Sequence, residues 1–127
     1  MWFEYAHGKE KIIHMFNSEL SLVDVVFESF LFYTHSSLRV NFHVKKIPQH
    51  VPEKWKTVKF NSIRINLEFS NIIKFESKGC NLGFRCTPMI YFNDNNIYLI
   101  IKDKDFELRC ISEFMEIQDI APFLGRP

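Results

Sequence analysis

The chain has 127 residues, the size of one domain, and its 16 basic and 15 acidic residues nearly cancel. This balance excludes a global electrostatic attraction to nucleic acid, and no apolar run reaches the roughly 18 residues that a membrane-spanning helix needs. The 14 Phe, with 4 Tyr and 2 Trp, favour strands around an aromatic core, so we expect a single domain over residues 1–127.

The first part of the chain predicts one short helix and then strand periodicity. Ile12, Ile13 and Phe16 fall on one face of a helix over residues 9–16. The following strand alternates with a period of two, and one of its faces holds Val23, Val25, Phe27, Leu31 and Tyr33. Phe30 and Phe32 interrupt this alternation, so we expect the far end of the strand to be covered on both faces.

Two regular strands come next, on either side of a proline-containing loop. Residues 38–45 and 62–69 each place an apolar side chain at every second position. His35-Ser36-Ser37 predicts a hairpin connection before the first of these strands. Pro48 and Pro52 lack the backbone N–H that a sheet ladder needs, so the segment between the two strands is expected to be a loop.

The last third of the chain predicts a meander. A short apolar run at residues 72–75 precedes it, with a loop around Gly79. Strands are expected at residues 89–92, 97–101 and 106–111, joined by turns at 93–96 and 102–105. These turns are rich in Asn and Asp, which tolerate left-handed backbone conformations. Residues 114–120 fit either a final strand or one helical turn, and extended structure is favoured.

Together these elements predict a mainly β fold of the α+β class. We expect six to eight strands in a single antiparallel sheet, with one short N-terminal helix packed against it. Because some strands are apolar on both faces, the sheet should curl into a half-barrel or fold over itself as a sandwich.

The sequence has no arrangement typical of catalysis or metal binding. Its five histidines are scattered, without the spacing of a metal site. Cys86 has only Arg85 as an activating neighbour in sequence, so we expect a structural thiol rather than a nucleophile. We therefore expect a protein that is not an enzyme and that uses no metal and no cofactor.

The cysteines and the N-terminus both favour a cytoplasmic protein. The three cysteines are an odd number, which argues against a disulfide framework and favours a reducing compartment. Residues 1–8 lack the basic and apolar regions of a signal peptide.

Charge is unevenly distributed along the chain. Basic residues dominate positions 38–65, where Glu53 is the only acid, and acidic residues lead from Asp94 onward. This distribution fits either solvated strand faces or a dipolar surface that steers a charged partner. Few aromatic residues accompany the basic segment, so a nucleic-acid partner is not expected. Among them, Trp55 either caps the core or is a partly exposed anchor for a partner.

Several dispersed positions carry a family resemblance. The aromatic cluster Trp2-Phe3-Glu4-Tyr5 precedes a short helix that ends in Met15-Phe16, and Leu20-Ser21-Leu22 then leads into a long strand. Pro48, Pro52 and Trp55 separate later strands. This arrangement resembles the Immunity protein 50 family of bacterial polymorphic-toxin systems over nearly the whole chain.

The resemblance implies a protein that binds and neutralises a cognate toxin domain, which needs no catalytic residues. It assigns no contact residues, and the near-neutral charge departs from the acidic character of many immunity proteins. Our contact hypothesis is the acidic C-terminal turns, which would meet a basic toxin surface, with Trp55 as an added anchor. The acidic residues concerned are Asp94, Asp103, Asp105 and Glu107.

Two alternatives to toxin binding stay open at this point. The chain could bind a small ligand in a Phe-lined pocket inside the curled sheet. It could also be a structural or oligomerisation module, forming a homodimer through exposed edge strands.

Overall fold

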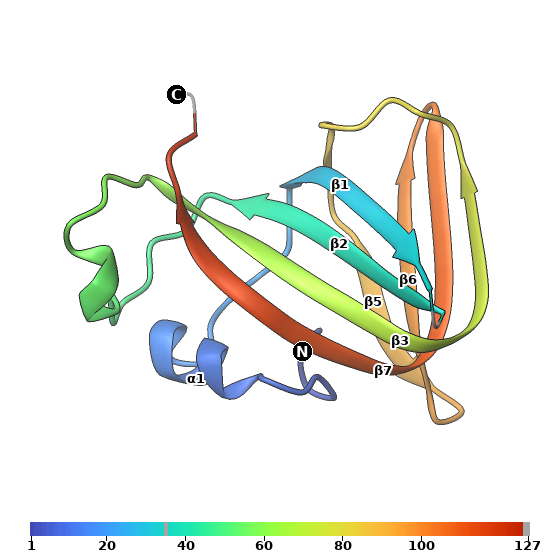
Figure 1. The fold of residues 1–127 in the computed structure, drawn as a ribbon, viewed down its shortest axis with the longest axis horizontal. Coiled ribbons are helices and arrows are strands. Elements are labelled where there is room, and N and C mark those ends of the chain that lie inside the picture. Colours follow the sequence, from blue (N-terminus) through green and yellow to red (C-terminus); the bar gives the residue numbers. More distant parts are fainter. Residues whose placement is uncertain (35, 126–127) are drawn as a thin grey trace.

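Seven strands form one antiparallel sheet in the computed structural model, which describes residues 1–34 and 36–125 (Figure 1). The strand order is β4-β1-β2-β3-β7-β6-β5, so β4 and β5 are the two edges of an open sheet. The elements are α1 (Glu10–Phe16), β1 (Val25–Tyr33), β2 (Ser37–Val44), a 3-10 helix (Glu53–Trp55), β3 (Ser62–Lys78), β4 (Arg85–Cys86), β5 (Met89–Asn93), β6 (Asn96–Asp103) and β7 (Phe106–Phe123). The predicted curled antiparallel sheet with one short helix is confirmed.

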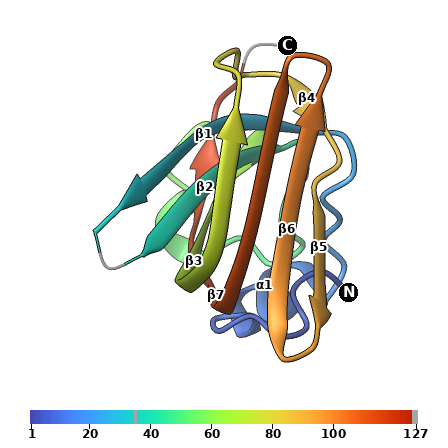
Figure 2. The same cartoon turned by 90° about the vertical axis from the view of Figure 1, so that its right-hand side faces the viewer.

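The sheet curls because its two longest strands pass through both of its halves. β3 has 17 residues and β7 has 18, and they pair along most of their length. One half pairs β1 and β2 with the start of β3, while the other pairs β5 and β6 with the start of β7. Two register shifts between β3 and β7 mark bulges, which bend strands. In Figure 2, β1 and β2 lie behind the β5–β6 half and cross it at an angle.

This continuity corrects one prediction and supports another. A strand was expected at residues 62–69 and only a short apolar run at 72–75, but both belong to β3. The backbone continues through Asn71, whose φ of 52° is left-handed, and through a register shift between Ile72 and Lys74. Residues 114–120 are extended, as favoured, and form the second half of β7.

The core lies between the two halves of the curled sheet and is filled with aromatic rings. Phe27 of β1 stands at its centre, with its ring centroid 5.6 Å from that of Phe42 and 5.7 Å from that of Phe106. Phe16 of α1 is fully buried in the same cluster. These rings fill the interior in which a Phe-lined ligand pocket was considered. This packing argues against small-ligand binding inside the curled sheet.

The N-terminal segment covers the edge of β7 that β6 leaves free. β6 pairs with β7 only as far as Ser112, which leaves that edge of β7 unpaired beyond this residue. His7 fills the gap: its N–H donates to the Met115 carbonyl and its own carbonyl accepts from Ile117, both at 2.8 Å. This pairing places α1 against the core, where Ile12 is fully buried.

The face predicted for the end of β1 is wrong. A register shift between Phe27 and Ser29 indicates a bulge, after which the strand presents the opposite set of side chains to the core. Phe30 and Phe32 therefore lie opposite Val40 and Leu38 on the inner face. Leu31 is 55% exposed, so this end of β1 is not covered on both faces. Tyr33 pairs with Ser37 at the predicted hairpin, but His35 lies outside the described residues.

Two further local predictions are confirmed and two are wrong. Ile13 is 45% exposed and does not share the buried face of Ile12, and Val23 is 67% exposed and does not share that of Val25. Every second residue of β2 from Leu38 to Val44 is buried. The β5–β6 turn adopts the left-handed conformation expected of its residues, with φ of 50° at Asp94 and 61° at Asn95. No helix in the described part of the chain is long and apolar enough to cross a membrane.

Candidate functional site

The middle of β6 is apolar on both faces, although only one face is buried. Ile97, Leu99 and Ile101 point into the core and are at most 3% exposed. Tyr98 and Ile100 point outward and are half-buried. The solvent face of an antiparallel sheet is ordinarily polar, so these two outward residues are unusual.

Neighbouring strands extend this apolar character into a patch. Tyr98 lies opposite Tyr91 of β5 and Ile111 of β7, while Ile100 lies opposite Met89 of β5. The two tyrosine rings are parallel, with centroids 4.9 Å apart and an interplanar angle of 1°. Met89 is 55% exposed and Tyr91 40%. We call this surface the outer patch, and it consists of Met89, Tyr91, Tyr98, Ile100 and Ile111.

Charged side chains surround the outer patch and pair with one another. Glu107 of β7 lies 3.6 Å from Lys102 and 3.3 Å from Arg109. Loss of hydration acts to raise the pKa of Glu107, but these two cations outweigh it and hold that pKa below its usual value. On β3, Lys74 and Glu76 form a further pair at 3.4 Å. An apolar, tyrosine-containing centre with a charged rim is the composition typical of protein–protein interfaces.

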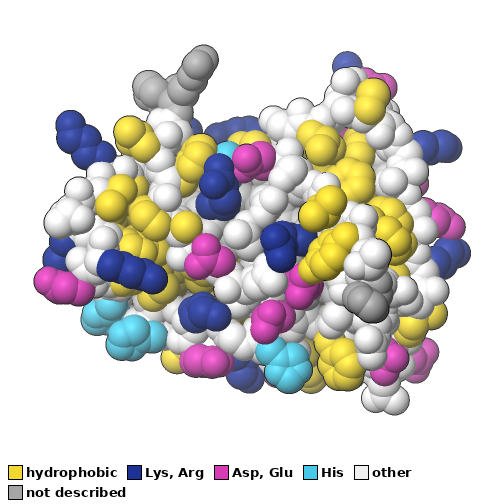
Figure 3. Space-filling model, viewed as in Figure 1, with side chains coloured by type: hydrophobic (Ala, Val, Ile, Leu, Met, Phe, Trp, Pro, Cys, Tyr) yellow, Lys and Arg dark blue, Asp and Glu magenta, His cyan; other side chains and the backbone are white. Residues whose placement is uncertain are grey.

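The other half of the sheet has a different outer surface. Arg64 of β3 binds Glu28 of β1 at 3.3 Å, and His43 of β2 contacts the same carboxylate. Two rows further along, Arg39 faces Glu68 at 3.8 Å. The side of the molecule shown in Figure 3 has acidic and basic side chains interspersed over its centre. This half therefore has the ordinary polar face of an antiparallel sheet.

The four acidic residues predicted to form one contact surface do not all lie together. Asp103 and Asp105 are exposed at the β6–β7 turn, and Glu107 follows at the start of β7. Asp94 lies at the other end of β6, roughly 20 Å away along the strand. Neither Asp103 nor Asp105 forms an ion pair with another described residue. Both carboxylates are therefore exposed and unpaired within the described part of the chain.

Trp55 caps the core and is not an exposed anchor. Its side chain is 3% exposed and packs edge-to-face against Phe60, with ring centroids 5.5 Å apart. The 3-10 helix that carries it follows Pro52, whose φ of −59° suits that position. In the folded chain Trp55 offers almost no surface to a partner, which overturns the anchor interpretation.

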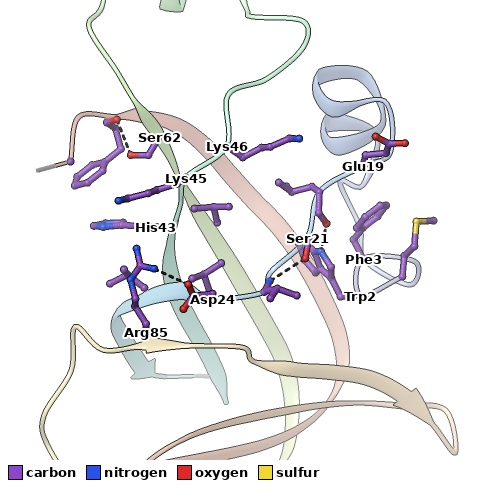
Figure 4. A pocket seen from close by; sticks show the side chains of 18 of the residues that line it. Trp2, Phe3, Glu19, Ser21, Asp24, His43, Lys45, Lys46, Ser62 and Arg85 are labelled. Carbon is purple, nitrogen blue, oxygen red and sulfur yellow. Dashed lines mark hydrogen bonds and ion pairs between the residues drawn. The ribbon is translucent and has the colours of Figure 1, made fainter. Parts of the chain in front are cut away.

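A large groove lies at the end of β2. It has a volume of about 1300 Å³ and runs between the N-terminal segment, the end of β2 and the start of β1 (Figure 4). Phe3, Val25 and Val44 are its buried apolar lining. Lys45 and Lys46 are exposed at its edge, and their side chains leave the chain in opposite directions (Figure 4).

The titratable groups of the described residues do not converge on a reactive centre. Burial, followed by the nearby Asp103 and Asp24 carboxylates, raises the pKa of the Cys86 thiol to about 11. Burial alone raises that of Cys110 to about 12. Both thiols are therefore protonated and weakly nucleophilic at neutral pH. Among the described residues no three His, Cys, Asp or Glu side chains could together hold a metal ion.

Sequence reasoning missed the outer patch, although a signal for it is present. Residues 97–101 are five consecutive apolar residues, which we interpreted only as a strand. The structure covers only one face. The groove gave no comparable signal, because its lining comes from segments far apart in the sequence.

Comparisons with known proteins gave one match. A family model described as Immunity protein 50 matches residues 8–123, which include α1 and every strand of the sheet. No curated protein and no solved structure gave a significant match.

Proposed function

Because this chain belongs to the Immunity protein 50 family, we propose that it binds and neutralises a cognate bacterial toxin domain. The family match over residues 8–123 carries this proposal. In it the chain acts in the cytoplasm of the toxin-producing bacterium, by stoichiometric contact and without catalysis or a cofactor. Neither a nucleic acid nor a membrane takes part.

The outer patch is the surface that best fits a toxin domain. Its three neighbouring strands, with two rows of outward side chains, span roughly 200 Å². A stable complex needs about 800 Å² from each partner, so the patch would be the centre of a larger interface. Stacked Tyr91 and Tyr98 are side chains of the kind that dominate binding energy at such centres.

The acidic β6–β7 turn would add electrostatic attraction at one end of this interface. Asp103 and Asp105 have no ion-pair partner among the described residues, so a basic toxin surface could pair with both. Glu107 already has two cationic neighbours and would contribute less. Asp94, at the opposite end of β6, would contact a separate part of the toxin.

Co-expression with a toxin domain encoded beside this chain's gene tests the proposal. Wild-type chain should restore growth, and Tyr98→Ala should weaken toxin binding by 30-fold or more, as expected for a central aromatic contact. Tyr33→Ala is the matched control, because Tyr33 is a half-buried tyrosine of β1 outside the patch. If wild-type chain gives no protection, the toxin proposal is wrong. Equal effects of the two variants would instead reject the outer patch.

Self-association is the second candidate, and one observation favours it. β5 is a sheet edge whose outward residues, Met89 and Tyr91, belong to the outer patch. Edge strands with apolar side chains can pair with a second copy of themselves. The solution mass decides this: a dimer that dissociates on Tyr91→Ala would support self-association, and a monomer would exclude it.

A further inference from the structure

We propose that the groove at the end of β2 binds an acidic, partly apolar segment of the same partner that covers the outer patch. The inference rests on the proposed function, because the occupant is part of the toxin domain. It adds a second contact region and specifies the chemistry of the segment that fills it.

The apolar part of the segment is inferred from the lining and rim of the groove. Phe3, Val25 and Val44 are at most 6% exposed and form an apolar lining. Val23 and Leu124, at the rim, are 67% and 62% exposed, more than any outer-patch residue. Covering such side chains contributes binding free energy in proportion to the apolar area removed from water.

The acidic part is inferred from the charges that stay unpaired. Asp24 and Arg85 satisfy each other at 2.7 Å across one wall. Lys45 and Lys46 have no ion-pair partner among the described residues. Of the two acidic residues that line the groove, Asp24 is paired with Arg85 and Glu19 is in no ion pair with another described residue. Because the two lysines project to opposite sides of the chain, a segment crossing the end of β2 meets both (Figure 4). Carboxylates on that segment would form ion pairs with the Lys45 and Lys46 side chains.

The size of the groove favours a length of polypeptide over a small molecule. Its volume of about 1300 Å³ exceeds the range of roughly 300–1000 Å³ typical of small-molecule sites. It is also open to the surface instead of enclosed.

A smaller cavity lies between the groove and the β5 edge, which would let one partner reach both the groove and the outer patch. Met1 and Trp2 line the groove and also this cavity of about 340 Å³ beside β5. The opposite wall of that cavity includes Tyr91 of the outer patch. Trp2 is held in place there by a 2.8 Å hydrogen bond from its indole N–H to the Leu20 carbonyl. A toxin domain on the outer patch could therefore extend a segment around the β5 edge into the groove.

Charge reversal at the groove tests the inference against the toxin domain. Lys45→Glu/Lys46→Glu should weaken binding by at least tenfold. Lys54→Glu/Lys59→Glu is the matched control, because it makes the same charge change at two exposed lysines that do not line the groove. It should change the affinity by less than threefold. Equal losses in the two variants would overturn the inference and indicate a general charge effect. All four lysines are exposed, and circular dichroism verifies folding.

A peptide titration separates this inference from the toxin proposal. The probe is a synthetic peptide of alternating Glu and Leu, added to ¹⁵N-labelled chain, with a Lys-Leu peptide as control. The acidic peptide should shift the amide signals of Val25, Val44 and Lys46, and the basic peptide should not. If the toxin domain binds while neither the peptide nor the lysine reversals show an effect, the groove inference is wrong and the function stands. If the peptide binds in the groove but the toxin domain does not bind, the toxin proposal fails alone.

Discussion

Two glycines in the loop between β3 and β4 allow a controlled test of how the acidic turn is held. Gly79 has a φ of 97°, and a Cβ added there would lie 2.1 Å from the Asp105 carbonyl oxygen. Carbon–oxygen contacts ordinarily begin near 3.3 Å, so this Cβ would be about 1.2 Å too close. Gly83 has a similar φ of 89°, but a Cβ there would meet no atom within 4 Å.

Alanine substitution should therefore separate backbone strain from steric overlap. Both variants force a side chain into a left-handed region, at a cost of about 1–2 kcal/mol. Gly79→Ala must in addition displace the β6–β7 turn, and overpacking of this kind typically costs about 1–3 kcal/mol more. We expect a total loss of about 2–5 kcal/mol for Gly79→Ala, against about 1–2 kcal/mol for Gly83→Ala.

Urea unfolding, followed by circular dichroism, measures both losses as shifts in midpoint at an unchanged slope. Equal destabilisation by the two substitutions would refute the close approach of Gly79 to the turn. A larger loss at Gly83 would contradict the loop geometry as a whole.

Further predictions concern the thiols, the buried tryptophan and one glutamate. Cys80 is exposed and should react with Ellman's reagent in the folded chain, whereas buried Cys110 should react only on unfolding; a fast phase that survives Cys80→Ser would be inconsistent with this. Trp55→Ala should lower the free energy of unfolding by about 3–5 kcal/mol in urea, and a loss below about 1 kcal/mol would contradict its capping role. Burial, and then the Glu116 carboxylate, raise the pKa of Glu68. The protonated Glu68 side chain therefore contributes its full stabilisation of the folded chain below pH 4.5, and this stabilisation is lost as the pH rises through the raised pKa. Glu68→Gln should therefore raise Tm relative to wild type at pH 7 but not near pH 4, and an equal gain at both would contradict the assignment.

The fold was predictable where one local pattern decides the structure. β2 alternates without interruption and has a covered inner face, so its boundaries and buried residues follow directly from the sequence. The alternation pattern did not predict the inner face of β1 correctly, because the register shift between Phe27 and Ser29 changes which side chains face the core. The continuity of β3 through Asn71 was equally hidden, since it depends on pairing with β7 and not on local preference.

The candidate site was only partly predictable for a related reason. Asp94 and Asp103 are close in sequence and share a charge, but β6 separates them because they occupy its two ends. The five apolar residues from Ile97 to Ile101 did indicate two apolar faces. Whether the second face meets the core or solvent depends on how far the sheet curls, which the sequence pattern does not specify.

Calorimetric titration of the chain with a toxin domain encoded beside its gene tests the central claim most directly. The proposal predicts one-to-one binding that Tyr98→Ala weakens and Tyr33→Ala leaves intact. No measurable binding by wild-type chain, or binding to which Tyr98 and Tyr33 contribute equally, would contradict it.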